Sequence, residues 1–475
     1  MTNSAAAALP PGPSLPRLVQ AALLMRYSAW FLAACRRRYG NIFTLRVAGF
    51  GTMVYVNDPA DIKTVFAGDP RVFHAGEANE MLGGLLGESS LLLSDDDVHR
   101  DRRRLMLPPF QRDAVAHQAA LMAEIAAENI AGWPVGREFA VAPKMSEITL
   151  EVILRIVIGA TDQARLAMLR KVMPRVLDVG PWETLALAKP ELMNRRLWRR
   201  LRRHIAEADE LLYAEIADRR ADPNLAVRTD ALAMLVRSTD DASDGTCAMT
   251  DAELRDQLMT LLVAGHDTTA SGLAWALERL TRHPAILAKA VRAAEASGSG
   301  DPAGDEYLDA LAKETLRIRP VVFDVGRVLT EPIELAGYAL PARTMVAPGI
   351  GLVHGSAEVY SDPERFDPDR MLGATLSPTT WLPFGGGNRR CLGANFAMVE
   401  MRVVLREILR RVELSTTASA GERQQLKHVI LVPRRGARIR VGAVRDVPAA
   451  ARLAAPEGEC PAGRRTTSSS PSMPR

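Results

Sequence analysis

The sequence contains little cysteine, little net charge and no long uninterrupted hydrophobic run. Its 475 residues include only four cysteines, at positions 35, 247, 391 and 460, and no two of them form a C-x-x-C pair. This scarcity excludes a disulfide framework. The formal net charge of +4 gives no reason to expect nucleic-acid binding.

The N-terminal region lacks the features of a membrane span and of a secretory signal. Two apolar stretches, 18–25 and 27–35, are separated by Arg26, whereas a spanning helix needs about 20 nearly uncharged residues. The first sixteen residues carry no basic side chain and are rich in proline, unlike a signal peptide. We therefore expect a cytoplasmic protein without a transmembrane segment. Residues 18–35 would form an amphipathic helix that packs on the protein itself or touches a membrane surface.

Helical patterns dominate the rest of the chain. Residues 40–57 are expected to form two strands, and most segments from 58 to 300 to be helical. Short strands are expected again over 325–346. A last helix should occupy 394–411 and be followed by a hairpin over 428–441 that turns between its proline and glycine. The pattern predicts a mainly α fold with a small β-rich part.

Among the four cysteines, Cys391 has surroundings unlike those of a core residue. Glycines at 385–387 precede it and allow a tight turn and a close approach to a flat ligand. The helix expected from Ala394 would direct unpaired N–H groups and its positive dipole end at a thiolate, and Arg389 adds a cation. Such a cysteine is a ligand or a nucleophile.

The neighbouring residues favour Cys391 as the axial ligand of a haem iron. A nucleophile requires a base, and no histidine lies within thirty residues on either side. Zinc requires further Cys or His ligands, which this segment lacks. Haem requires one thiolate, a glycine-rich approach and cations for its propionates.

The same segment resembles the F-x-x-G-x-R-x-C-x-G haem-binding signature of the cytochromes P450. All five specified positions agree: Phe384, Gly387, Arg389, Cys391 and Gly393. The resemblance implies a single-domain cytochrome P450 fold of the soluble bacterial type. It also implies haem b as the cofactor, Cys391 as the iron ligand, and Phe384, Arg389 and Gly393 as parts of the haem-binding loop.

A long helix with an unusual centre is expected between Thr250 and Pro284. Thr250 and Glu253 form a capping box at its start. In its middle, residues 264–269 include Gly and two Thr, and Gly costs about 1 kcal/mol relative to Ala in a helix. We therefore expect the helix to be interrupted by a functional kink, with threonine hydroxyls bonding the freed carbonyls.

Residues 264–269 resemble the A/G-G-x-D/E-T-T element of the cytochromes P450. The resemblance implies that Asp267 and Thr268 relay protons to dioxygen, and that Ala264 and Gly265 leave room for it. His266 occupies the variable position of the element, and we expect it to have a surface or structural role.

Three charged residues resemble a structural network of the same family. Glu314 and Arg317 lie one helical turn apart, and Arg370 follows in the segment Phe366–Arg370. The resemblance implies a buried network that holds the cysteine loop. Such a network must be complete, because one uncompensated buried charge costs about 3–5 kcal/mol.

Further cations are expected at the haem propionates. His99 and Arg103 lie one turn apart on a helix, as in the H-x-x-x-R pair of bacterial cytochromes P450. Arg327 and Arg389 match other propionate arginines of the family, and arginine suits a carboxylate because its planar fork donates two hydrogen bonds. An error of one position in register would replace Arg103 by the arginine at 102 or 104.

The resemblance also implies a substrate pocket lined from four separate segments. The expected lining residues are apolar: Met81, Leu82, Leu85, Leu261, Val322, Phe323 and Val429. Such a lining favours a hydrophobic organic substrate. Asp324 is the exception and would face either solvent or a polar group.

The motifs together divide the chain into three regions. Residues 1–35 would be an N-terminal lead-in with the amphipathic segment, 36–445 the cytochrome P450 catalytic domain, and 446–475 a disordered tail rich in Ala, Pro and Ser. The predicted activity is that of a monooxygenase, which inserts one oxygen atom from dioxygen into a hydrophobic small molecule by hydroxylation or epoxidation.

No G-x-G-x-x-G follows a predicted strand, so electrons are expected from separate proteins, a ferredoxin and its reductase. Arg100, Arg104, Arg112 and Arg390 are the expected docking patch for an acidic ferredoxin, and the enzyme is expected to be a monomer. Two alternatives stay open. One is a haem-thiolate isomerase, dehydratase or peroxygenase that needs no external electrons, and the other is a haem protein that only binds a ligand.

Overall fold

The computed structural model describes residues 9–177, 198–240, 249–427 and 429–447, and every structural statement below concerns these residues. The tail predicted beyond Asp446 lies almost wholly outside them. The α-helices are α1 Arg17–Tyr39, α2 Pro59–Ala67, α3 Gly83–Leu86, α4 Asp96–Met106, α5 Arg112–Ile130, α6 Ala142–Val152, α7 Gln163–Leu177, α10 Arg199–Arg220, α11 Ala231–Asp240, α12 Asp251–Leu280, α13 Pro284–Gly298, α14 Pro302–Ile318, α15 Ile350–His354 and α16 Ala394–Arg411.

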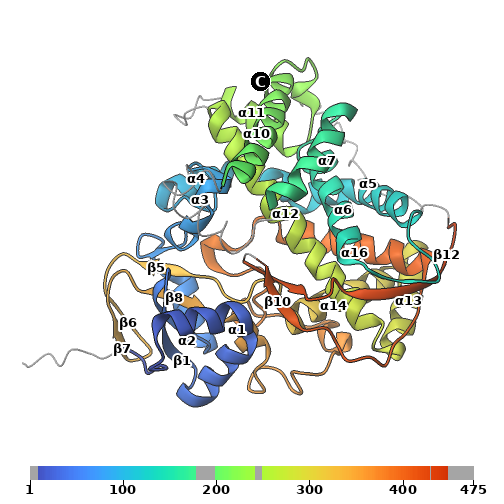
Figure 1. Ribbon diagram of the computed structural model, residues 1–475. Helices are drawn as coiled ribbons and strands as arrows, with labels where there is room; N and C mark the ends of the chain where they lie inside the picture. Colours follow the sequence, from blue (N-terminus) through green and yellow to red (C-terminus); the bar gives the residue numbers. More distant parts are fainter. Residues whose placement is uncertain (1–8, 178–197, 241–248, 428, 448–475) are drawn as a thin grey trace, which may run out of the picture.

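The strands are short and form four small sheets. They are β1 Ile42–Val47, β2 Gly51–Val56, β3 Phe73–His74, β4 Glu138–Ala140, β5 Arg327–Leu329, β6 Ile333–Leu335, β7 Tyr338–Leu340, β8 Met345–Pro348, β9 Val412–Leu414, β10 Gln424–Lys427, β11 Ile430–Pro433 and β12 Arg438–Val444. The sheet orders are β1-β2-β8-β5-β3, β10-β11, β4-β12-β9 and β6-β7. Figure 1 shows the five-stranded sheet with α1 and α2 at one side of a larger helical part, which confirms the predicted fold class.

The five-stranded sheet is covered on both faces because its strands alternate their apolar side chains. Phe43 and Leu45 of β1 and Tyr55 of β2 pack with α1. The intervening Val54 and Val56 pack on the opposite face, with residues of α2 and α15. This period of two is what an extended strand imposes on its side chains.

Helix α12 crosses the helical part and is almost entirely buried, as Figure 1 shows it running through the centre of the molecule. The predicted capping box is confirmed: Thr250 and Glu253 exchange hydrogen bonds at its start. The predicted interruption is wrong, because the helix is continuous from Asp251 to Leu280. The hydroxyls of Thr268 and Thr269 donate to the carbonyls of Ala264 and Gly265, at 2.7 and 3.2 Å, without breaking it.

The helix after the cysteine begins at Ala394 and ends at Arg411, as predicted. It packs against α5, α13 and α14, and also against α12. Its buried residues, including Phe396, Val404 and Ile408, recur at helical spacing and join the main core cluster. The cysteine loop is therefore held at the start of a firmly packed helix.

The expected hairpin over 428–441 is wrong, because the two strands that this segment contains, β11 and β12, do not pair with each other. The chain does turn after Pro433, where the Gly436 N–H donates to the Pro433 carbonyl at 3.0 Å. However, β11 pairs with β10 before it, and β12 pairs with β4 and β9 instead. The strands separate because Ile439 of β12 is buried in a different sheet, which a local turn signal cannot indicate.

The two apolar N-terminal stretches form one helix, α1, whose backbone leaves helical geometry at Tyr27. By length and composition alone α1 could cross a membrane, so the sequence argument against a long apolar helix is incomplete. About a third of its most apolar window is buried against the protein, and core helices of soluble proteins meet the same criterion.

Candidate haem-thiolate site

The loop that carries Cys391 is a tight turn against helix α2. The Cys391 N–H donates to the Phe384 carbonyl at 2.9 Å, and Gly387 has a φ of +66°. A Cβ on Gly386 would lie 2.2 Å from the Phe66 ring, and one on Gly387 would lie 2.1 Å from the Phe66 carbonyl oxygen. These two glycines are therefore required by the approach of Phe66, and not only by a flat ligand as the sequence argument held.

The Cys391 thiol is accessible, although enough protein surrounds it for burial to raise its pKa. A side chain that is both surrounded and accessible lines an internal space. The Gly393 N–H and the nearby Arg103 and Arg390 act in the opposite direction and lower the pKa. The expected stabilisation of the Cys391 thiolate by the start of α16 is thus present. In the protein alone, the desolvation of that thiolate outweighs it and the pKa of Cys391 is raised.

Arg389 does not face the thiol. Its guanidinium forms an ion pair with Asp95, just before α4. The Asp95 carboxylate also accepts the backbone N–H groups of residues 75–77. The ion pair with Asp95 consequently holds Arg389 beside His99. A side chain that binds a haem propionate would need to be held in such a position.

Three arginines, Arg103, Arg327 and Arg389, lie near His99 of α4. Burial and the charges of Arg389, Arg103 and Arg327 lower the pKa of His99 to about 4. Burial and Arg389 lower the pKa of Arg327 to about 10. Within the described residues, neither Arg103 nor Arg327 has an ion pair, and Asp95 is the carboxylate nearest to balancing the cluster.

This surplus of buried positive charge fits a ligand with two carboxylates. Unpaired buried cations are costly, and haem propionates would offset that cost. Arg103 of α4 lies close enough to Cys391 for their charges to interact, and its propionate role stays a prediction. The neighbouring Arg102 instead donates to Ser94 and pairs with Glu253 at 3.2 Å.

The centre of α12 has an exposed residue within a buried helix. Ala264 is exposed, although most residues from Leu254 to Leu280 are buried. Gly265 faces elsewhere: a Cβ there would lie 2.7 Å from Ile153, so this glycine permits close packing and the expectation that it makes room for oxygen is not supported. An open space therefore adjoins Ala264, and Asp267 and Thr268 close to it are partly exposed.

Asp267 lies between two basic groups that the sequence did not single out. Its carboxylate is 3.3 Å from His266 Nε2 and 3.9 Å from the ammonium of Lys427 on β10. His266 is buried, and its Nδ1 donates to the Leu262 carbonyl at 2.9 Å, which bears out a structural role. Lys427 could not be found from the sequence, because β10 reaches α12 only through the tertiary fold.

A fully buried carboxyl, Glu400 of α16, lies beside Thr269 of α12. Neither of its oxygens has a clear hydrogen-bond partner, and burial raises its pKa well above the usual range. The burial of Glu400 could have been predicted from the sequence, because it lies between Phe396 and Val404 on the apolar face of the predicted helix.

The predicted charged network is present in the geometry. Arg317 donates twice to the carboxylate of Glu314, at 2.7 and 2.8 Å, and Arg370 Nε lies 3.3 Å from the same group. Arg317 and Arg370 also donate to backbone carbonyls between residues 354 and 365. The network therefore fixes the irregular chain that leads to the cysteine loop.

His354 extends this network and was missed. Its Nδ1 donates to the Arg317 carbonyl at 3.1 Å, and its Nε2 accepts the Leu382 N–H at 2.9 Å. Burial and Arg317 lower its pKa to about 3, so it is neutral. His354 thus links α14 to the segment just before Phe384.

The structure brings only some of the predicted pocket residues together. Leu82, Leu85 and Leu261 belong to one apolar cluster of the helical part. Val322 packs with the five-stranded sheet and Phe323 with α1, whereas Val429 is exposed in the turn between β10 and β11. Met81 is half-buried near Leu82 in the turn before α3.

Asp324 is directed at the five-stranded sheet, where it meets Tyr55. Its carboxylate accepts the Tyr55 phenol at 2.5 Å, and burial raises its pKa to about 6. This contact joins the loop before β5 to the five-stranded sheet.

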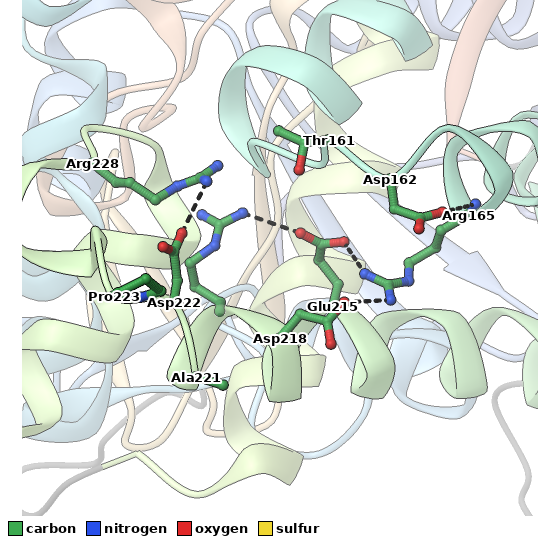
Figure 2. A pocket seen from close by; sticks show the side chains of 10 residues that line it. Thr161, Asp162, Arg165, Glu215, Asp218, Ala221, Asp222, Pro223 and Arg228 are labelled. Atoms are coloured by element: carbon green, nitrogen blue, oxygen red, sulfur yellow. Dashed lines mark hydrogen bonds and ion pairs between the residues drawn. The ribbon is translucent and has the colours of Figure 1, made fainter.

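A separate hollow of about 320 Å³ lies between α7 and α10, away from Cys391 (Figure 2). Its arginines are already ion-paired: Arg165 with Glu215 and Asp218, each at 2.6 Å, and Arg228 with Asp222 at 3.1 Å. Arg219 pairs with Glu215 as well. The hollow is therefore a charged surface network that holds two helices together.

An accessible cysteine at the start of a packed helix, with Arg103 and Arg390 near its thiol, has the surroundings that an axial thiolate ligand of haem would need. The family model described as "Cytochrome P450" matches residues 10–441. The chain belongs to the cytochrome P450 family and is a haem-dependent monooxygenase of that family.

Its similarity to individual proteins agrees with this assignment. Cytochrome P450 135B1 of Mycobacterium tuberculosis is 75% identical over 464 residues, which cover 98% of both chains. Cytochrome P450 135A1 of the same species is 40% identical over 443 residues, covering 93% of this chain and 97% of the relative.

Two solved structures share the fold at 23% identity. A retinoic acid bound cyanobacterial CYP120A1 has a TM-score of 0.79, with 92% of this chain and 100% of the other covered. The cytochrome P450DA haem domain has a TM-score of 0.77, with 92% and 98% covered.

Proposed function

We propose that this enzyme inserts one oxygen atom from dioxygen into a hydrophobic organic molecule, with electrons supplied by separate redox proteins. The observation that carries the proposal is the exposed Ala264 beside Asp267 and Thr268, in the middle of an otherwise buried helix. The haem would supply the activation of dioxygen, with the Cys391 thiolate favouring cleavage of the O–O bond.

The residues of α12 would manage protons. Thr268 Oγ1 lies 2.7 Å from the Ala264 carbonyl, so its hydroxyl is directed along the helix toward the open space. Asp267, held between His266 and Lys427, can exchange a proton with the hydroxyl of Thr268 or a water beside it and recover that proton from its basic neighbours.

The cationic cluster would orient the cofactor. His99, Arg103, Arg327 and Arg389 would bind the two propionates, and Phe384 and Gly393 would shape the loop on the thiolate side. Glu314, Arg317 and Arg370 would hold that loop without taking part in the chemistry.

The substrate would be apolar. Leu82, Leu85 and Leu261 lie in one cluster and supply an apolar wall, which favours a hydrophobic substrate. Met81, next to this wall, is kept as a pocket residue, whereas the packing of Phe323 against α1 argues for a structural role. Val322 and Val429 stay predictions.

Replacement of Thr268 by alanine is expected to lower the product formed per electron pair roughly tenfold or more, because the hydroxyl that guides proton transfer is lost. Electrons would then appear as hydrogen peroxide. The measurement compares NAD(P)H consumed, peroxide released and product formed, with surrogate redox partners and a substrate found by spin-state shift.

The Thr268→Ser variant keeps a hydroxyl and should retain most of the coupling. Unchanged coupling in Thr268→Ala would instead favour the isomerase, dehydratase or peroxygenase alternative. No turnover of any substrate by the unaltered enzyme would favour a ligand-binding haem protein.

We further propose that an acidic ferredoxin docks on the side of the cysteine loop. Arg100, Arg104, Arg112 and Arg390 are exposed there on α4, α5 and the loop itself. The double variant Arg100→Glu, Arg112→Glu should reduce the electron-transfer rate roughly tenfold at low salt and flatten its salt dependence.

The matched control for that experiment is Arg200→Glu, Arg202→Glu, which makes the same change of charge on exposed residues of α10. Equal rates and equal salt dependence in both double variants would contradict the docking patch.

A further inference from the structure

Helix α1 has an exposed apolar face. Leu18, Val19, Met25 and Trp30 project to solvent, and we call these four residues the outer face of α1. Leu18 is 75% exposed and Trp30 is 62% exposed. Exposed apolar residues are common singly, but a contiguous group on one helix marks an interaction surface.

The opposite face of α1 is fixed to the protein. Leu24, Phe31 and Leu32 are buried against the five-stranded sheet. The buried amide of Gln20 donates to the Leu15 carbonyl at 2.7 Å and accepts the Arg46 N–H at 2.9 Å. The buried face of α1 therefore packs on the sheet, whereas the apolar residues of the outer face are left exposed to solvent.

The charge around the outer face is positive. Residues 1–57 contain six arginines and no acidic residue, which is more positive charge than the net +4 of the whole chain. Arg17, Arg26, Arg37 and Arg38 are exposed, and within the described residues none of them has an ion pair. An apolar helix face bordered by arginines without ion pairs is complementary to a surface that has an apolar interior and an anionic outer layer.

We propose that the outer face of α1 binds the surface of an anionic phospholipid bilayer, with the helix lying in the interface. Leu18, Met25 and Trp30 would enter the boundary between headgroups and acyl chains, and the arginines would contact phosphates. The helix lies on the membrane and does not cross it, because its other face is part of the protein core and its backbone deviates at Tyr27.

The test is co-sedimentation of the haem-loaded enzyme with vesicles. Phosphatidylcholine vesicles are compared with vesicles of phosphatidylcholine and phosphatidylglycerol, at low and high salt. The enzyme is expected to bind the anionic vesicles at least tenfold more strongly, with an affinity that falls as salt rises. Fluorescence of Trp30 should be quenched by brominated acyl chains, and this part of the quenching should be absent from Trp30→Phe.

Two pairs of variants separate the apolar and the charged contributions. Leu18→Ser, Trp30→Ser should weaken binding roughly tenfold or more, since each change removes an apolar side chain from the interface. Its control is Val227→Ser, which changes an equally exposed residue far from α1. Arg37→Glu, Arg38→Glu should also weaken binding about tenfold, whereas Arg200→Glu, Arg202→Glu on the distant α10 (Figure 1) should change it little.

Three outcomes would overturn the proposal. One is equal binding to neutral and anionic vesicles, and another is binding that the α1 variants leave unchanged. The third is a concentration-dependent dimer in sedimentation velocity that Leu18→Ser, Trp30→Ser abolishes, with no vesicle binding, since a second copy of the chain would then cover the face. Haem content and the carbon monoxide spectrum of each variant show that the enzyme is folded.

Discussion

The variant Cys391→Ser is expected to lose the long-wavelength Soret band of the dithionite-reduced, carbon monoxide-bound protein. A serine hydroxyl does not replace a thiolate as the axial ligand, and the electron donation that favours O–O cleavage is lost with it. Product formation should fall on the order of a thousandfold or more, which corresponds to about 4 kcal/mol in activation free energy. The measurements are the difference spectrum and turnover with surrogate redox partners.

The Cys391→Ser substitution should reduce the haem content of the protein less than it changes the carbon monoxide difference spectrum. The side chains of His99, Arg103 and Arg327, which are expected to bind the propionates, are unchanged by the substitution. The variant should therefore retain part of its haem while its band moves to shorter wavelength.

The control for this experiment is Cys35→Ala, which removes a buried thiol of α1 and should leave the spectrum unchanged. A long-wavelength band that survives in Cys391→Ser, or that disappears in Cys35→Ala, would contradict the assignment of the iron ligand.

The second large effect is expected for Glu314→Ala. This change leaves the guanidinium of Arg317, which is only 1% exposed, without its carboxylate and removes the partner of Arg370. Breaking a buried ion pair from one side costs about 3–5 kcal/mol, a large fraction of the stability of an ordinary domain. Urea unfolding of the purified protein measures the loss, and haem content reports whether the cysteine loop is still in place.

Two further variants keep that test decisive if Glu314→Ala fails to fold. Glu314→Gln retains the oxygen that accepts from Arg317 and should lose less stability than alanine. Glu358→Ala removes an exposed carboxylate from its 3.3 Å pair with Arg36 and should cost less than about 1 kcal/mol. A loss for Glu314→Ala as small as that for Glu358→Ala would show that the network is not structural.

Local sequence determined much of the fold. The capping box at Thr250, the strands on either side of Gly49 and the helix from Ala394 to Arg411 all occur where the residues predict them. They depend on interactions within a few positions, namely side-chain caps, turn residues and the spacing of apolar side chains. The hairpin after Lys427 was misplaced, because the choice of partner for β12 depends on β4 and β9, which lie far away in the sequence.

The candidate site shows the same division. Cys391, with its spaced phenylalanine, glycines and arginine, could be predicted as the haem ligand because these residues form one contiguous motif within one loop. The direction of Arg389 toward Asp95, the contact of Lys427 with Asp267 and the link from Arg317 through His354 to Leu382 were not predictable. Each of these contacts joins segments that are brought together only when the core packs.

The sequence by itself therefore determined the family and its general chemistry, that of a haem-thiolate monooxygenase of the cytochrome P450 family. The roles of Cys391 as iron ligand and of α12 as the helix beside dioxygen stay predictions. Only the tertiary structure decided which side of each helix meets the site and which faces outward. It directed the side of Gly265 that would carry a Cβ at Ile153 rather than into the open space next to Ala264, and it left Leu18 and Trp30 uncovered on α1. The physical reason is that a motif specifies residue types within one segment, whereas burial and ion pairing are set by every segment packed around it.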